Sequence, residues 1–250
     1  MLQALFFDIS GVLYEGQRAI AGAAKAVGRA QASPLQVRFL TNTSRKTRQR
    51  VHQDLLALGF ELALSQIITA PSAAKAMIQA KGWRPFCLVH EKIRSEFDDL
   101  DQAQPNAVLV GDAAEGFSYP ALDQAFRLCL EGAPLIGVGM NRYFKLEGQL
   151  HLDAGPFIRA LEYAAGTEAI IVGKPAPAFF LEAVASVGVK PDQVMMVGDD
   201  VQGDVEGALS AGLQACLVQT GKYRLGDESG CRRRFPCVAS VVEAVELALG

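Results

Sequence analysis

The chain alternates short, wholly apolar runs with longer segments of helical periodicity, and this alternation constrains the fold more than any other feature. The apolar runs have the length of strands, and most of them contain no polar residue. Strands that are apolar throughout are buried on both faces, as in a parallel sheet that is covered by helices. The runs lie at residues 4–7, 37–40, 86–89, 107–110, 135–138, 169–172, 194–197 and 215–218.

Helix-like segments separate these runs. Gly59, Gly166 and Gly188 follow three of the segments, at the position where helices commonly end. The repeated order of strand and helix predicts an α/β fold with a doubly wound, Rossmann-like parallel sheet, and residues 225–237 are predicted to form a loop. The helix-like segments span residues 19–32, 47–58, 73–80, 122–130, 157–165, 178–187, 205–211 and 241–249.

Composition excludes several classes of protein. Of the 250 residues, 50% are apolar and 20% are charged, which excludes a disordered chain. The net charge of −3 argues against a dedicated nucleic-acid binder. No apolar run approaches the ~18 residues of a membrane helix, and no basic segment precedes the first run, so we expect neither membrane contact nor a signal peptide. Scattered cysteines without a CxxC pair predict reduced thiols and a cytoplasmic location.

Four polar clusters each follow a predicted strand. In open α/β sheets, ligands bind outside the carboxyl ends of the strands. We therefore expect the four clusters to meet at one site. In chain order they are Asp8 with Ser10, Thr41 with Asn42, Lys174, and Asp199 with Asp200 and Asp204.

The residue types in these clusters suit phosphoryl chemistry. Asp8 and Asp199 supply the hard carboxylate oxygens that Mg²⁺ prefers, and an aspartate can attack phosphorus to form an aspartyl-phosphate. Thr41 and Asn42 can donate hydrogen bonds to phosphate oxygens, while Lys174 can offset a carboxylate and hold a phosphate. Each cluster alone has a plainer explanation as a turn or a helix cap. Their joint occurrence, in order after apolar strands, favours a phosphate site.

The order and spacing of DISG, TNTS, VGKP and VGDD resemble the haloacid dehalogenase superfamily of phosphatases. The resemblance covers nearly the whole chain and is weakest at residues 226–237. Within the superfamily, segments such as LDAGPFIRALEYA and TGKYR are most similar to a group that hydrolyses pyrophosphate, phosphohistidine and phospholysine. The resemblance implies a Mg²⁺-dependent phosphatase, a homodimer, that acts on phosphorylated small molecules or on proteins carrying phosphohistidine or phospholysine.

The resemblance also implies roles for the residues that attack phosphorus and hold the metal ion. Asp8 would be the nucleophile and a magnesium ligand, and Asp199 would be the second carboxylate ligand. Ser10 would give its backbone carbonyl to the metal ion and would lie against the substrate.

Other residues of the clusters would support this chemistry. The resemblance implies that Thr41, Asn42 and Lys174 bind the phosphate, and that Lys174 takes part in catalysis. Asp204 would orient Asp199, Lys174 or a water on the metal ion. Asp200 would shape the loop around them.

The domain organisation follows from the resemblance as well. It implies a discontinuous catalytic core, residues 1–70 and 166–250, with an inserted α/β cap at residues 71–165. Such a cap covers the site and helps to select the substrate. The segment Asp153–Pro156 resembles a cap loop that faces the active site, and it fits a turn with a helix start equally well.

Ser10 departs from the pattern of the wider superfamily, in which most phosphatases have an aspartate two residues after the nucleophile as general acid and base. A serine hydroxyl does not ionise near neutral pH and cannot take that role. The more similar group carries the same serine. We therefore expect poor reaction of leaving groups that need strong protonation, whereas phosphate and imidazole need less. Two alternatives stay open: a phosphomonoesterase for sugar or nucleotide phosphates, and a non-catalytic protein that binds phosphorylated ligands.

A basic cluster follows Thr41 and Asn42. Arg45, Lys46 and two further arginines lie within residues 45–50. They fit a solvated helix start, and they also fit an electrostatic collar that attracts phosphorylated substrates.

Overall fold

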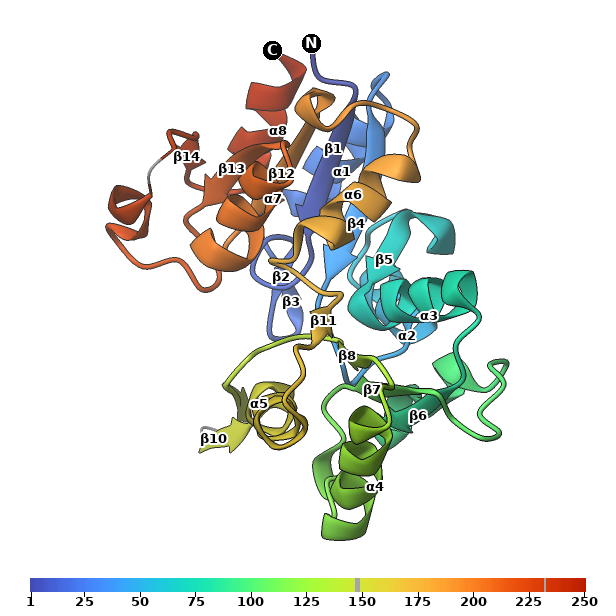
Figure 1. Ribbon diagram of the computed structural model, residues 1–250. Coiled ribbons are helices and arrows are strands. Elements are labelled where there is room, and N and C mark those ends of the chain that lie inside the picture. Colours follow the sequence, from blue (N-terminus) through green and yellow to red (C-terminus); the bar gives the residue numbers. More distant parts are fainter. Residues whose placement is uncertain (147–148, 232) are drawn as a thin grey trace. The chain divides into compact units, whose positions relative to one another are not determined.

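The computed structural model describes residues 1–146, 149–231 and 233–250, and the chain forms two compact units (Figure 1). The predicted cap, residues 71–165, lies inside the second unit. Each unit is built from more than one stretch of chain. The first unit comprises residues 1–41, 48–68 and 174–250, and the second comprises residues 42–47 and 69–173.

The first unit is built on a six-stranded sheet in the spatial order β14-β13-β12-β1-β4-β5. The strands from β14 to β4 pair in parallel. Every residue of β1 and β12 is buried, as expected for strands that are covered on both faces. The strands are β1 (Ala4–Asp8), β4 (Gln36–Thr41), β5 (Ile67–Thr69), β12 (Val194–Gly198), β13 (Gln214–Val218) and β14 (Cys237–Val238).

Helices cover both faces of this sheet. Because side chains alternate along a strand, residues such as Phe7 and Phe39 face one side, where their rings stack 5.9 Å apart. On that side they share a core with α1 (Ala23–Gln31), α2 (Arg48–Ala57) and α8 (Val241–Leu249). Figure 1 shows the remaining helices, α6 (Pro177–Ala185) and α7 (Gly207–Ser210), over the other face.

A short hairpin replaces the start of the first predicted helix. The strands β2 (Tyr14–Glu15) and β3 (Arg18–Ala19) pair in antiparallel fashion, and α1 begins only at Ala23. The prediction of a helix from residue 19 was therefore wrong. Gly22 explains the difference, because its φ of 80° is left-handed and stops the helix from extending toward the N-terminus.

The second unit is built on a parallel sheet in the order β11-β8-β7-β6. One face packs on α3 and a short 3₁₀ segment, and the other packs on α4 and α5. The strands are β6 (Pro85–Leu88), β7 (Ala107–Val110), β8 (Leu135–Gly137) and β11 (Ile170–Ile171); the helices are α3 (Ala70–Lys81), α4 (Tyr119–Leu130) and α5 (Ala154–Ala165), with the 3₁₀ segment at Glu91–Phe97.

A second hairpin stands outside this sheet. Its strands, β9 (Tyr143–Leu146) and β10 (Gln149–Leu152), pair only with each other, in antiparallel fashion. All of β10 is exposed, which explains why no apolar run marks it in the sequence.

The sequence-based prediction of an α/β fold is confirmed. All eight apolar runs form strands, and helices lie on both faces of both parallel sheets. The predicted loop at residues 225–237 contains a short 3₁₀ segment, Asp227–Gly230, and ends where β14 begins; residue 232 lies outside the described residues. In the part of the chain that the structure describes, no helix combines the length and the apolar character needed to span a bilayer.

Candidate active site

Three neighbouring strands of the first unit carry polar residues to one edge of the sheet. Asp8 ends β1, and the strand register places it opposite Leu40 of β4, one residue before Thr41. Asp199 follows β12, the neighbour of β1 on its other side. Asp8, Thr41 and Asp199 are all buried. The parallel topology thus brings together residues that are far apart in the sequence.

A buried cluster of charges lies at this edge. Asp8, Asp199 and Asp204 each offer a carboxylate oxygen, and these oxygens lie within 4.8 Å of one another. The Nζ atom of Lys174 contacts Asp8 Oδ1 and lies 2.6 Å from Asp204 Oδ1. All four side chains are buried, so the cluster holds three carboxylates against one ammonium group. Buried charge without a partner costs several kcal/mol, in the range of about 3–5.

Burial shifts the pKa values of these groups. Burial raises the pKa of Asp8 to about 7, and although Lys174 opposes the shift, Asp204 and Asp199 add to it. Burial likewise raises the pKa of Asp199 to about 6, against a hydrogen bond from the backbone of Lys222. For Lys174, burial would lower the pKa, but Asp204 and Asp8 outweigh it and raise the pKa above its ordinary value. The cluster of three carboxylates and one ammonium group therefore has too little positive charge to balance its negative charge.

A hard divalent cation fits this set of ligands. Carboxylate oxygens are its preferred donors, and its two positive charges would balance the excess negative charge of the cluster. The three aspartates could therefore hold a metal ion. Asp204 was predicted to orient Asp199, Lys174 or a water on the metal ion, and in the structure its Oδ1 atom accepts a 2.6 Å hydrogen bond from Lys174 Nζ.

The raised pKa of Asp8 predicts the pH dependence of stability for the metal-free protein. The pKa of Asp8 is about 7 in the folded chain and 3.8 in its ordinary state, so the folded protein binds this proton more tightly. The free energy of unfolding should therefore rise as the pH falls from about 8 to about 6. Urea denaturation in EDTA measures it. The Asp8→Asn variant should lose most of this dependence, and a wild-type protein whose stability falls over that range would contradict the raised pKa.

One segment that supports the cluster was not given a role from the sequence. The backbone N–H of Lys222 donates a 2.7 Å hydrogen bond to Asp199 Oδ2, and the Thr220 hydroxyl donates to the carbonyl oxygen of Gly11. These bonds fix Asp199 and join the loop after β13 to the loop after β1. The sequence does contain a pattern that could have pointed to this segment, because Thr220–Lys222 is a fifth polar cluster that follows a predicted strand.

Glycines make room for the carboxylates. A Cβ atom on Gly11 or Gly221 would clash with the side chain of Asp199, and both glycines have positive φ, 89° and 67°. A Cβ atom on Gly198 would clash with Asp204. Only glycine lets the backbone approach these aspartates so closely.

The other predicted residues of this unit lie at the margin of the cluster. Ser10 is exposed, two residues beyond Asp8. Asp200 Oδ1 accepts hydrogen bonds from the backbone of Gln202 and Gly203, at 3.1 and 2.9 Å. Its Oδ2 atom pairs with Lys222 at 3.1 Å. Asp200 thus bonds to the backbone of the turn that leads to Asp204.

Some predicted residues belong to the second unit. Asn42 begins its first segment. Asp153 Oδ1 accepts a 2.7 Å hydrogen bond from Ala154 N at the start of α5, which agrees with the helix-start interpretation of this segment. In the basic cluster, Arg45 is not at a solvated helix start, because it pairs with the buried Asp112 and lies ahead of α2.

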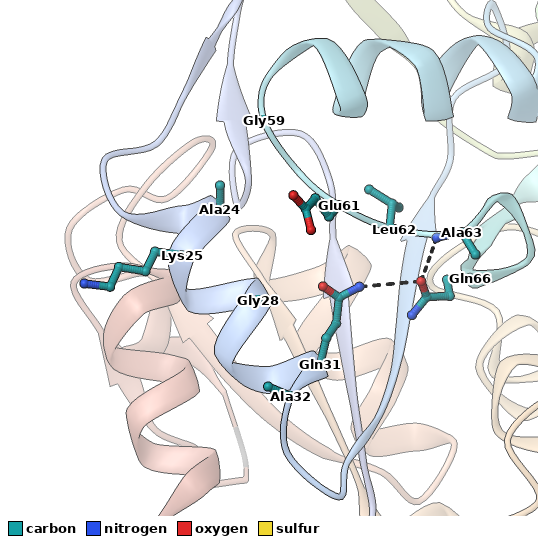
Figure 2. Close-up of a pocket in the computed structure, with 10 residues that line it drawn as sticks. All are labelled: Ala24, Lys25, Gly28, Gln31, Ala32, Gly59, Glu61, Leu62, Ala63 and Gln66. Atoms are coloured by element: carbon teal, nitrogen blue, oxygen red, sulfur yellow. Dashed lines mark hydrogen bonds between the residues drawn. The ribbon is translucent and has the colours of Figure 1, made fainter.

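A pocket of about 610 Å³ in the first unit contains none of the predicted site residues (Figure 2). It lies between α1 and residues 59–66, where the side chains of Gln31 and Gln66 are hydrogen-bonded at 3.5 Å. Lys25 and Glu61 are its charged residues. The pocket is separate from the carboxylate cluster.

Comparison with known proteins identifies relatives along the whole chain. Residues 5–103 match a family model described as haloacid dehalogenase-like hydrolase, and residues 171–244 match one described as HAD-hydrolase-like. Phospholysine phosphohistidine inorganic pyrophosphate phosphatase from Rattus norvegicus is 46% identical over 256 residues, covering 99% of this chain and 94% of the rat protein. Haloacid dehalogenase-like hydrolase domain-containing protein 2 from Bos taurus is 43% identical, covering 91% of this chain and 88% of its own.

Solved structures share the fold. A 4-nitrophenylphosphatase from Thermotoga maritima superposes with a TM-score of 0.88 at 22% identity, covering 98% of this chain and 97% of its own. A hypothetical protein from Pyrococcus horikoshii superposes with a TM-score of 0.89 at 28% identity, covering 99% of this chain and 100% of its own.

Proposed function

The chain belongs to the haloacid dehalogenase-like hydrolases, and from this membership we propose that it is a Mg²⁺-dependent phosphatase of inorganic pyrophosphate and of phosphorus–nitrogen bonds. The observation that carries the proposal is the buried cluster of Asp8, Asp199 and Asp204 around Lys174. The substrate class is supported by the 46% identity to a relative that is named for phospholysine, phosphohistidine and pyrophosphate.

The nucleophile in this proposal is Asp8. One of its carboxylate oxygens attacks phosphorus, an aspartyl-phosphate forms, and the bond from phosphorus to the leaving oxygen or nitrogen breaks. Water then attacks phosphorus and releases inorganic phosphate, which restores the carboxylate. Lys174 contacts Asp8 and favours the charged form of its carboxyl group, which is the form that attacks.

The phosphoryl oxygens need donors and positive charge. Thr41, Asn42 and Lys174 bind them in this proposal, and Ser10 lies against the substrate. Asp8 and Asp199, with the backbone carbonyl of Ser10, would hold Mg²⁺, and the position of Asp204 in the cluster adds a third carboxylate. When bound, Mg²⁺ supplies positive charge that offsets the repulsion between Asp8 and the phosphoryl oxygens.

Residues 71–165, within the second unit, act as a cap that selects the substrate, which is a small phosphorylated molecule or a protein with phosphohistidine or phospholysine. The protein works as a homodimer in the cytoplasm. Five cysteines without a disulfide are in keeping with a reducing compartment.

The test of the proposed function is a substrate panel. Phosphate release is measured from pyrophosphate, phosphohistidine, phospholysine and common phosphomonoesters, with Mg²⁺ and with EDTA. We expect Mg²⁺-dependent turnover of the first three and slow turnover of the esters. Full rates in EDTA would contradict the mechanism. Preference for sugar or nucleotide phosphates would favour the esterase alternative, and phosphate binding without any turnover would favour the non-catalytic alternative.

Ser10 gives a prediction about substrate range. Ser10→Asp adds a carboxyl group two residues after the nucleophile, where it could protonate an alkoxide leaving group. General acid catalysis contributes about 10²–10⁴-fold. We expect kcat/KM for an alkyl phosphate to rise toward this range relative to kcat/KM for pyrophosphate, whose leaving group needs less protonation. The ratio of the two kcat/KM values, in wild type and variant, measures the effect.

A control variant separates the acid from the change of size and polarity. Ser10→Asn adds a side chain of similar shape that cannot ionise, and it should leave the ratio near the wild-type value. An unchanged ratio in a folded Ser10→Asp protein that binds Mg²⁺ would show that Ser10 does not limit the substrate range.

A further inference from the structure

The short segment 42–47 connects β4 to α2 in the chain but belongs to the second unit, where Arg45 makes its contacts. Arg45 Nε contacts Oδ2 of Asp112, which lies two residues beyond β7. The other oxygen, Oδ1, accepts a 3.1 Å hydrogen bond from Ala114 N. The guanidinium carbon of Arg45 also lies 4.1 Å from the centre of the Phe144 ring, on β9.

These contacts hold Arg45 in one position. The Asp112 side chain is only 3% exposed and the Arg45 side chain 32%, so the pair is partly withdrawn from water. A charge-assisted hydrogen bond in such surroundings is strong, and loss of either partner leaves a charge buried without compensation. The face of Phe144 adds a cation–π contact, which depends on the planar guanidinium.

Asn42, in the same segment, lies against Gly173, the last residue before the chain returns to the first unit. A Cβ atom on Gly173 would lie 2.8 Å from Asn42 Oδ1, so the Asn42 side chain packs directly on Gly173. Gly173 precedes Lys174, and Asn42 follows Thr41. The segment that Arg45 anchors therefore contains Asn42, follows Thr41 directly and packs on the residue that precedes Lys174.

We propose that Arg45 is a positioning residue, which fixes the Thr41–Asn42 turn for phosphate binding through its bond to Asp112 and its contact with Phe144. This inference rests on the proposed function. Asp112 already neutralises the Arg45 guanidinium, so the role of Arg45 is to place other donors rather than to bind the substrate itself. A small displacement of such donors has a large effect, because misplacement by ~1 Å can cost about 100-fold in rate.

The experiment compares Arg45→Gln and Asp112→Asn with wild type. It measures KM and kcat for pyrophosphate, the inhibition constant of inorganic phosphate, and the Mg²⁺ affinity from the Mg²⁺ dependence of thermal stability. We expect both variants to raise KM and the phosphate inhibition constant about 10- to 100-fold. The double variant should be no worse than either single one. Mg²⁺ affinity should stay unchanged, because contacts within the first unit hold its ligands.

Two milder variants keep the test valid if the first two fold poorly. Arg45→Lys keeps the charge but not the planar group, and Phe144→Leu keeps the ion pair but removes the ring face. Each should raise the phosphate inhibition constant less than Arg45→Gln does. The matched control is the pair Arg127–Asp123 of the same unit, in which the Arg127 side chain is 72% exposed: Arg127→Gln and Asp123→Asn should leave every measurement unchanged.

Four outcomes would overturn the inference. An unchanged phosphate inhibition constant in a destabilised Arg45→Gln protein would mean a purely structural role. Tighter phosphate binding by Asp112→Asn would mean that Arg45 itself contacts the substrate once it is released. A wild-type protein that neither binds nor releases phosphate would overturn the proposed function together with this inference, whereas active wild type with unaffected variants would overturn the inference alone.

Discussion

Replacing Asp8 by asparagine is expected to lower kcat for pyrophosphate hydrolysis by about 10⁴- to 10⁶-fold, the scale of loss when an enzyme is deprived of its nucleophile. The amide keeps the shape of the side chain, but it lacks the charged oxygen that attacks phosphorus, and it removes one of three carboxylates that can hold the metal ion. Phosphate release measures the rate. Mass spectrometry of acid-quenched wild-type protein should detect the phosphoryl group on Asp8.

Asp192→Asn is the matched control for this change, since Asp192 is an exposed aspartate of the same unit. It should retain the wild-type rate. In metal-free buffer near pH 8 the Asp8→Asn protein should be at least as stable as wild type, because a buried negative charge has been removed. An Asp8→Asn protein with wild-type activity would exclude an aspartyl-phosphate at this position.

The second large effect is expected at Lys174. Lys174→Met removes the ammonium group that contacts Asp8 and Asp204, so three buried carboxylates remain without it. Loss of one partner from a buried ion pair costs about 3–5 kcal/mol, which we expect in the metal-free protein. Urea denaturation in EDTA measures it. The variant should also lose most of its activity, because Lys174 binds phosphate in the proposed function.

Magnesium should partly rescue the stability of Lys174→Met. Its positive charge replaces the missing ammonium group, so the gain in thermal stability on adding Mg²⁺ should be larger in the variant than in wild type. Lys190→Met, at an exposed lysine of the same unit, is the control and should change the stability by less than about 0.5 kcal/mol. Equal gains in the variant and wild type would contradict a metal ion inside this cluster.

The parts of the site that follow from topology could be predicted from the sequence. Asp8 and Asp199 follow wholly apolar runs, and because such runs form neighbouring parallel strands, their polar ends meet at one edge of the sheet. The same reasoning applies to Thr41, although the run before it contains Arg38. Which of its three expected partners Asp204 would contact could not be predicted, since its bond to Lys174 depends on the course of the turn after β12.

Features that depend on short strands or distant contacts could not be predicted. Each strand of the β2–β3 hairpin has only two residues, too few for a pattern, so the helix was expected to begin four residues too early. Arg45 is one of several basic residues within residues 45–50, and nothing in the local sequence distinguishes it from the others. Its partner, Asp112, is 67 residues away, and only the folded chain shows that the two are joined.

The second unit is not a single insert, and this limits how the protein can be rebuilt. Residues 42–47 belong to that unit although residues 48–68 return to the first. A chimaera that exchanges only residues 69–173 with those of a relative would keep the native Arg45 opposite a foreign loop in place of Asp112. Recombination between relatives should therefore succeed only when residues 42–47 and 69–173 come from the same parent protein.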